Sequence, residues 1–303
     1  MTKSYGGTDG RGPADGPRAD ERPAGRRPVA GRRTDRRRRP VDEGWRADLA
    51  RWDIPEHILR RAPASPWGHS PARFAQRTEH ALAAPEGPSL DRVAEALPAG
   101  GSVLDVGAGT GAASLPLAGR LGKLVAVDVS AEMLAELTPR AERLGVPVRT
   151  VPGRWPDVAD RTPVADVAIA AHVVYNVPDL AAFLSELTRH ARRRVVLELT
   201  ERHPMSWLAP LWRHFHGVPR PARPTVHDLV AVAGALGHEV GHESRAAPLP
   251  RYASLDELAE SACRRLCLAP NRAEEVAGTA VALGMWPLPR ERWFTVWWEG
   301  RAV

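Results

Sequence analysis

The sequence VLDVGAGTG at residues 103–111 decides the fold. It begins as a short apolar run, which is typical of a buried parallel strand. Gly107, Gly109 and Gly111 follow, and glycine is favoured where the chain turns tightly and a ligand approaches the backbone. We expect a helix over 111–121, whose first amides would face a polar or anionic part of a ligand. The stretch therefore predicts the strand-to-helix junction at which doubly wound sheets bind ligands.

Apolar runs alternate with amphipathic stretches on both sides of this junction. The expected strands are 102–106, 123–128, 147–151, 165–171 and 194–199, with later ones near 238–243 and 293–299. The expected helices between and after them are 111–121, 130–144, 179–192, 225–236, 254–268 and 271–283. Such alternation predicts an α/β fold with a doubly wound, Rossmann-like and mostly parallel seven-stranded sheet.

The chain divides into three parts by composition. Residues 1–40 have almost no large apolar side chain, and we expect a disordered, Arg-rich tail. Residues 41–98 read as a helical segment that precedes the sheet. Residues 99–303 read as the ligand-binding domain, with helical insertions near 203–236 and 254–285.

The basic excess belongs to the tail. The chain has 42 Lys and Arg against 36 Asp and Glu, and residues 1–40 hold 12 of the former and 5 of the latter. The remainder is therefore 30 against 31, so a nucleic-acid partner is expected only through the tail. The run Arg36–Arg39 within it would contact nucleic acid or anionic lipid, or is simply solvated.

Several classes of protein are excluded by what the sequence lacks. No uninterrupted apolar run is long enough to span a membrane, and the first thirty residues contain no apolar signal region. The two cysteines do not make a disulfide scaffold. We expect no membrane partner and a reducing, cytoplasmic location.

Two carboxylates near the glycine loop narrow the class of ligand that it is expected to bind. The pattern of Gly107, Gly109 and Ala112 also fits a dinucleotide-binding loop. Asp105, however, lies within the strand, where a negative charge suits a ligand with a cationic amino acid part better than a pyrophosphate. Asp128 ends the next strand and can accept both hydroxyls of an adenosine ribose.

With these residues the sequence resembles the class I S-adenosylmethionine-dependent methyltransferases. The matching segments are VLDVGAGTG (103–111), LVAVDVSAEML (124–134), ADVAIAAHVVYNV (165–177) and VVLELT (195–200). The resemblance implies the class I methyltransferase fold and S-adenosyl-L-methionine as cofactor. The residues that it implies around the cofactor are Asp105 at the methionine end, Gly107, Gly109 and Gly111 along the loop, Asp128 at the ribose, Val129 and Met133 at the adenine, and Ala171 at the transfer site.

One corner of the implied cofactor site departs from the family. After the third strand the family often has an acidic residue that accepts a hydrogen bond from the adenine amino group. This chain has Arg154 there, followed by Trp155, and a guanidinium cannot accept a hydrogen bond. Either Asp157 substitutes for the acid, or backbone groups and stacking on Trp155 hold the adenine.

Candidate catalytic residues follow the fourth strand. His172 is the first candidate for a general base or a substrate-orienting group, because histidine titrates near neutral pH. Its alternative role is packing beside the cofactor. Tyr175 and Asn176 either orient a substrate or begin the next helix. Glu198 and Glu201 flank the end of the fifth strand, where either one of them holds a substrate cation or both face solvent.

The remaining candidates are aromatic, histidine and cysteine side chains. A substrate wall or a packed helix is expected from the segment that holds Trp207, Trp212, His214 and His216. No metal site is expected from its histidines, because His214 and His216 face different sides of a helix. Cys263 and Cys267 read as a buried apolar pair. Trp67 and Phe74 are candidates for a lid over the cofactor, or for ordinary packing at the sheet edge.

The sequence therefore favours a methyltransferase that acts on an oxygen, nitrogen or carbon nucleophile of a small molecule. The alternative is a methyltransferase that acts on RNA or protein and is guided by the basic tail. A protein that binds the cofactor without turnover and a nicotinamide-dependent oxidoreductase are further readings of the same loop.

Overall fold

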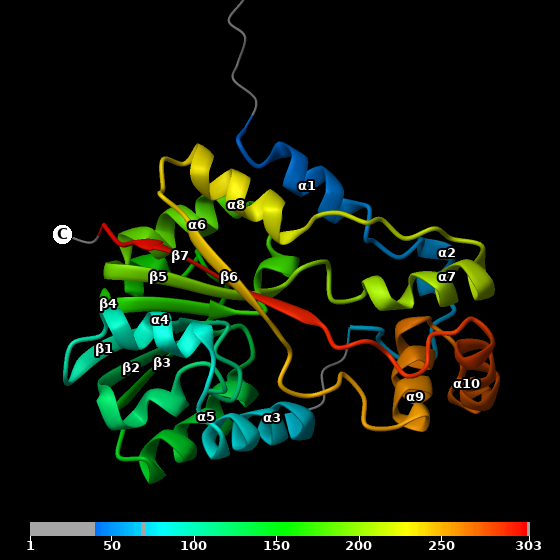
Figure 1. Ribbon diagram of the computed structural model, residues 1–303, viewed down its shortest axis with the longest axis horizontal. Coiled ribbons are helices and arrows are strands. Elements are labelled where there is room, and N and C mark those ends of the chain that lie inside the picture. The colour runs from blue at the N-terminus through cyan, green and yellow to red at the C-terminus, as the bar shows by residue number, and fades with distance from the viewer. Residues whose placement is uncertain (1–39, 68–70, 302–303) are drawn as a thin grey trace, which may run out of the picture. The chain divides into compact units, whose positions relative to one another are not determined.

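The computed structural model describes residues 40–67 and 71–301, which form a seven-stranded sheet in the order β3-β2-β1-β4-β5-β7-β6 (Figure 1). The strands are β1 (Gly101–Val106), β2 (Leu121–Asp128), β3 (Val148–Pro152), β4 (Ala165–Ala171), β5 (Ala191–Thr200), β6 (Gly241–Ala246) and β7 (Arg292–Glu299). Strands β1 to β5 are mutually parallel, and β7 is antiparallel to β5 and β6. The doubly wound, mostly parallel sheet predicted from the sequence is confirmed.

Helices precede, cover and extend the sheet. They are α1 (Glu43–Ala50), α2 (Glu56–Leu59), α3 (Pro71–Ala83), α4 (Pro88–Ala96), α5 (Ala131–Arg143), α6 (Leu180–Arg189), α7 (Ala209–His216), α8 (Val226–Ala235), α9 (Leu255–Arg265) and α10 (Ala273–Ala282). Short 3₁₀ helices are η1 (Leu115–Arg120), η2 (Ala159–Arg161), η3 (Val174–Asn176), η4 (Ser206–Leu208) and η5 (Pro270–Arg272).

Both faces of the sheet are apolar, as parallel strands require. In β1, neighbouring residues point to opposite faces: Val103 packs with α4 and α5, and Leu104 packs with α6 and α8. β2 and β4 repeat this alternation. The two resulting cores hold the strands in place, so the residues at their carboxyl ends have fixed positions.

The predicted helix over 111–121 is wrong. The chain forms turns through Ser114 and then only the 3₁₀ helix η1. Gly111 has a φ of 96°, outside the helical range, and Pro116 has no N–H to donate to a helical carbonyl. The glycine loop therefore leads into a turn whose core contacts come from Leu115 and Leu117.

Two other expectations shift by a few residues. The strand expected at 238–243 is β6, Gly241–Ala246. The helix expected over 271–283 is α10, which begins at Ala273 because residues 270–272 form the 3₁₀ turn η5. The predicted disordered tail lies outside the described residues.

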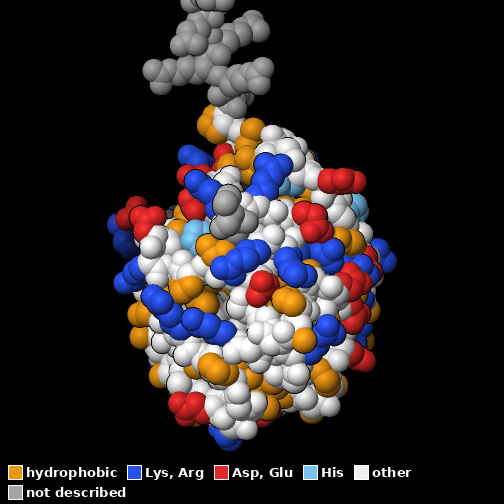
Figure 2. Space-filling model, turned by 90° about the vertical axis from the view of Figure 1, so that its left-hand side faces the viewer, with side chains coloured by type: hydrophobic (Ala, Val, Ile, Leu, Met, Phe, Trp, Pro, Cys, Tyr) orange, Lys and Arg blue, Asp and Glu red, His pale blue; other side chains and the backbone are white. Residues whose placement is uncertain are grey.

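A third apolar cluster lies beyond the carboxyl ends of the parallel strands, where α2, α7, α9 and α10 pack together (Figure 1). It includes Leu211, Leu258 and Val276. Within the described ranges, no helix combines the length and hydropathy needed to cross a membrane. At the opposite end, basic and acidic side chains are interspersed over the face that Figure 2 shows.

Candidate functional site

The glycine loop is tied to the end of the second strand by Asp128. Its Oδ2 accepts a hydrogen bond of 2.8 Å from the Gly109 amide, and its Oδ1 accepts one of 2.8 Å from the Ser130 amide. Ser130 then caps α5 by accepting from the Met133 amide. One carboxylate therefore fixes the loop and the start of the next helix, while lone pairs on both oxygens remain for a ligand hydroxyl.

Asp105 is a fully buried carboxylic acid on the glycine-loop side of β1. Neither of its oxygens has a hydrogen-bond partner among the described residues, and the nearby Ser114 hydroxyl has none either. Burial raises the pKa of Asp105 to about 7 and the charge on Asp128 adds to this rise; the Ser114 hydroxyl lies close enough to oppose it, although the two groups do not meet the geometry of a hydrogen bond. An unpartnered buried acid costs stability, which a cationic or N–H-donating ligand would restore.

The loop leaves room for a ligand beside Gly109. A Cβ built there would meet only Phe74, at an ordinary contact distance of 3.6 Å, whereas at Gly107 it would overlap Val173 at 2.3 Å. Val129, beside Asp128, is 67% exposed, and Met133 is buried. The loop, the two carboxylates and this open surface suit an adenosine bearing a cationic amino acid part, which is the cofactor that the resemblance implies.

Helix α3 covers the glycine loop. The Thr78 hydroxyl lies 2.7 Å from the Thr110 hydroxyl, with both residues buried, and Phe74 lies over Gly109. Trp67, the other predicted lid residue, lies elsewhere: it is 48% exposed and lines a small pocket with Trp212 and other residues of the third cluster.

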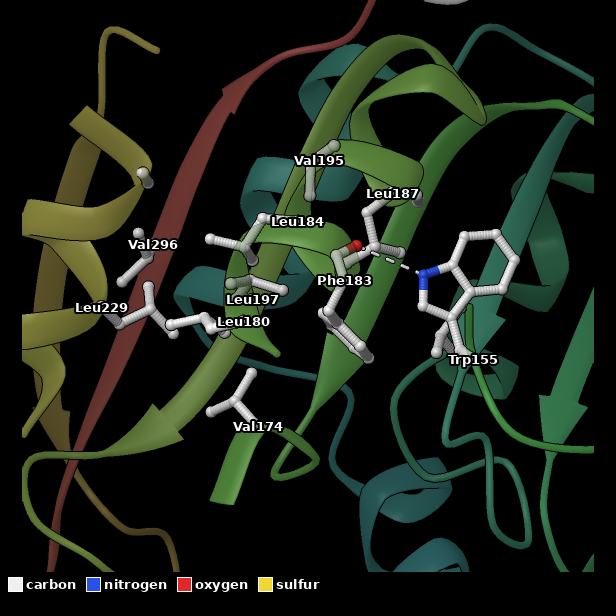
Figure 3. Packing of buried hydrophobic residues seen from close by; sticks show 14 of the residues in the cluster. Trp155, Val174, Leu180, Phe183, Leu184, Leu187, Val195, Leu197, Leu229 and Val296 are labelled. Atoms are coloured by element: carbon white, nitrogen blue, oxygen red, sulfur yellow. Dashed lines mark hydrogen bonds between the residues drawn. The ribbon is translucent and has the colours of Figure 1, made fainter. Parts of the chain in front are cut away.

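The position of Trp155, after β3, does not fit the alternative in which its ring stacks on an adenine. The Trp155 indole is buried in the core between the sheet and α6, and its N–H donates to the Phe183 carbonyl at 3.3 Å (Figure 3). Its ring therefore packs in the protein interior. Arg154 and Asp157 are both exposed. Of the two alternatives, the structure leaves Asp157 and backbone groups as the ones that could face an adenine.

His172 occupies an unusual backbone position at the end of β4. Its φ is 58°, which is rare for a residue other than glycine and is found at functional sites. Its Nε2 lies 3.4 Å from Oε1 of Glu198 on β5 and makes no hydrogen bond of good geometry. Ala171, the residue before it, is the last of β4.

Glu198 is enclosed between the sheet and α4. Its Oε2 accepts a hydrogen bond of 2.5 Å from the Ser89 hydroxyl, which also lies 2.8 Å from the Thr295 hydroxyl. Its pKa is lowered because the contacts with His172, Ser89 and Arg245 outweigh the opposing effect of burial. Glu198 is therefore ionised at neutral pH and faces His172, whereas the sequence allowed it to face solvent.

Tyr175 is buried in a structural position. Its hydroxyl lies 2.6 Å from the Thr200 hydroxyl, accepts from the Thr200 amide, and has a pKa raised chiefly by burial. It joins η3 to the end of β5. Asn176, the next residue, is exposed.

The aromatic segment after β5 lies mostly in the third cluster. Trp212 is buried, His216 contacts the Leu266 carbonyl at 2.7 Å, and His214 is exposed. His203 stacks on Trp52 with ring centroids 4.0 Å apart, and burial lowers its pKa to about 3. No group of three metal-ligating side chains occurs within the described part of the chain.

Sequence reasoning missed Arg77 and Trp293 near the site. Trp293, on β7, makes an edge contact with His172, with the ring centres 4.6 Å apart. The guanidinium carbon of Arg77 lies 5.9 Å from the centre of the Trp293 ring. A usable signal was the position of Arg77 one turn after Phe74 on a predicted lid helix. Because arginine is the general cation of this chain, no single arginine stood out.

Comparisons with known proteins agree with this geometry. Residues 103–194 match the family model described as a methyltransferase domain. A phosphatidylethanolamine N-methyltransferase of Cereibacter sphaeroides is 38% identical over 98 residues, which are 31% of this chain and 47% of that protein. The chain spans less than half the length of the curated relatives it matches.

Solved structures share the fold at low identity. The YcgJ protein of Bacillus subtilis has a TM-score of 0.50 and 16% identity, over 74% of this chain and all of that one. A structure described as a putative sarcosine dimethylglycine methyltransferase of Galdieria sulphuraria also has a TM-score of 0.50, with 13% identity, over 86% of this chain and 97% of that one. These likenesses establish the fold of the sheet and its helices.

Proposed function

We propose that this chain, whose residues 103–194 match a methyltransferase domain and whose seven-stranded sheet has the class I methyltransferase fold, uses S-adenosylmethionine to transfer a methyl group to an oxygen, nitrogen or carbon nucleophile of a small molecule. The observation that carries the proposal is the fully buried Asp105, unpartnered among the described residues, beside a glycine loop fixed by Asp128. A ligand with a cationic group and a ribose would interact with both carboxylates, the cation with Asp105 and the ribose hydroxyls with Asp128.

The chain's own residues account for cofactor binding. Asp105 provides negative charge for an amino acid ammonium or a sulfonium, Asp128 accepts from ribose hydroxyls, and Gly109 leaves the loop surface open. When bound, S-adenosylmethionine supplies a methyl group activated by the positive charge on its sulfur. The protein has then to align the nucleophile and exclude water.

His172 is suited to hold or remove the proton of the acceptor. It stands at the carboxyl end of β4, and the ionised Glu198 lies 3.4 Å from its Nε2. The Glu198 carboxylate is positioned to orient the ring and to face the positive charge that develops when the ring takes up a proton. The left-handed backbone of His172 sets the direction of this ring.

Helix α3 supplies the cover over the site. Phe74 and Thr78 hold it against the glycine loop, so the loop is shielded from water on that side.

Labelled methyl donor tests the proposal. We expect the purified chain, incubated with methyl-labelled S-adenosylmethionine and a cell extract, to transfer the label into the low-molecular-weight fraction. Deletion of residues 1–39 should leave this transfer unchanged. Label in RNA or protein that disappears with the deletion would instead favour the tail-guided alternative. No transfer to any fraction, despite cofactor binding, would leave a protein that binds without turnover.

A further inference from the structure

Arg77 on α3 carries a positive charge that forms no ion pair with any acid of the described residues. Among residues 40–67 and 71–301, its guanidinium makes no hydrogen bond and no ion pair; its recorded contact is with the face of Trp293. The side chain keeps exposed surface, yet burial lowers its pKa. An exposed cation that is nevertheless desolvated by its surroundings lies on a concave part of the surface, here called the recess, where its attraction for an anion is screened less by water than on a flat surface.

The charges around Arg77 leave the recess positive. Arg251 and Arg73 lower the pKa of Arg77 more than Glu291 and Glu198 raise it. Both of these acids are also engaged elsewhere: Glu291 is paired with Arg251, and Glu198 contacts His172 and Ser89. An additional anion would therefore be attracted to this place.

The recess lies beside the proposed transfer site. Trp293 is the shared neighbour: the Arg77 and Arg245 guanidinium carbons lie 5.9 and 5.8 Å from the centre of its ring, and His172 makes an edge contact with it at 4.6 Å. The Trp293 indole N–H and the His172 Nε2 are buried without hydrogen-bond partners among the described residues. Two guanidinium groups and the His172 ring are thus neighbours of one indole.

The position of Arg77 favours the acceptor over the cofactor. Trp293 pairs with Thr200 at the end of β5, and β4 separates β5 from β1, the strand that leads into the glycine loop. Phe74, one turn before Arg77 on α3, is the residue that reaches Gly109. The guanidinium therefore lies near Trp293, whose strand pairs with the end of β5, and the glycine loop is contacted by Phe74.

We propose that Arg77 binds an anionic oxygen group, a carboxylate or a phosphate, on the methyl acceptor and so places the acceptor beside His172. The proposal rests on the proposed methyl transfer and adds to it the class of substrate, an acidic small molecule. A guanidinium offers two parallel N–H donors that fit either group, and the positive recess attracts both.

Simple anions can test this site. The probes are benzoate, phenyl phosphate and the uncharged benzyl alcohol, each titrated into the full chain saturated with S-adenosylhomocysteine. We expect at least one anion to raise the melting temperature of the wild type and benzyl alcohol to have no effect. A larger shift with benzoate would assign a carboxylate, and a larger shift with phenyl phosphate would assign a phosphate.

Variants of Arg77 connect the binding to the guanidinium. R77M should weaken anion binding about tenfold or more, as expected for losing a charge-assisted hydrogen bond, while the affinity for S-adenosylhomocysteine stays within about twofold of wild type. R77Q replaces R77M if the latter does not fold. R143M, which removes an exposed arginine from α5, is the matched control and should bind the anions as the wild type does.

Three results would overturn the inference. They are no shift of the wild type with either anion, an equal shift in R77M or R77Q, and a tenfold loss of S-adenosylhomocysteine affinity in these variants, which would assign the guanidinium to the cofactor. Failure of the wild type to bind S-adenosylhomocysteine at all is a different outcome, because it refutes the proposed function itself.

Discussion

The two halves of the sheet form their parts of the site in different ways. On the β3-β2-β1-β4 side, the key contacts are short in sequence: Asp128 bonds to Gly109, 19 residues away, and to Ser130, two residues away. On the β5-β7-β6 side, Glu198 contacts Ser89 across 109 residues, and Ser89 contacts Thr295 across 206. The proposed cofactor side is therefore a local motif, and the proposed acceptor side is assembled from distant segments.

This difference explains what could be predicted. Strand β4 was predicted at its observed bounds, and the roles predicted for the glycines, Asp105 and Asp128, which stay predictions, rest on a pattern within 26 residues. The helix after Gly111 was predicted wrongly, because the helical periodicity of residues 111–121 was given more weight than Pro116. The positive φ of Gly111, which also prevents a helix, is visible only in the structure. The neighbourhood of His172, which holds Glu198, Trp293 and Arg77, could not be predicted, because only the packing of α3 and β7 brings these residues together.

The largest expected effect breaks the cofactor side alone. Gly109→Val should abolish measurable binding of S-adenosylhomocysteine, because the side chain would fill the loop surface and valine tolerates a φ of 53° poorly. Calorimetric titration measures the loss. Gly145→Val is the matched control, with a φ of 69° and no atom near its Cβ. It should keep wild-type affinity, and equal losses in both variants would mean that strain, not the pocket, is responsible.

A smaller effect is expected from variants on the proposed acceptor side, which should lower the rate of methyl transfer and leave cofactor binding unchanged. His172→Ala should lower the rate of label transfer about 100-fold, as expected for loss of a general base, and leave S-adenosylhomocysteine affinity unchanged. Glu198→Gln should lower the rate less, because it removes the charge beside the ring and keeps the ring. Unchanged turnover in His172→Ala would exclude a catalytic role for this residue.

The smallest expected effect is a change in the affinity for S-adenosylhomocysteine with pH. Asp105 has a pKa of about 7 in the unliganded protein, and a cationic ligand requires its ionised form. Affinity for S-adenosylhomocysteine should therefore rise about tenfold between pH 6 and pH 8. Asp105→Asn should bind more weakly, with no such rise. A wild-type affinity that is constant over this range would show that Asp105 does not contact the positive part of the ligand.

The ionisation of Asp105, which is expected to raise the affinity for the ligand as pH rises, is expected to lower the stability of the unliganded protein. Because its pKa in the folded protein exceeds that of an unfolded Asp, the folded state holds a proton that the unfolded state releases, and stability falls as pH rises from about 4 to about 7. Between pH 5 and pH 8, the unliganded wild type should lose about 3 kcal/mol of unfolding free energy relative to Asp105→Asn. Denaturant titrations at the two pH values measure this difference.

The central claim is that Asp128 and the glycine loop together hold an adenosine with a charged amino acid part. Calorimetric titration of S-adenosylhomocysteine into the wild type, into Asp128→Ala and into the exposed-carboxylate control Asp160→Ala tests it most directly. We predict one binding site in the wild type and in the control, an affinity at least about 100-fold lower in Asp128→Ala, and no heat from NAD in any of them. Wild-type affinity in Asp128→Ala, or binding of NAD in place of S-adenosylhomocysteine, would contradict the claim.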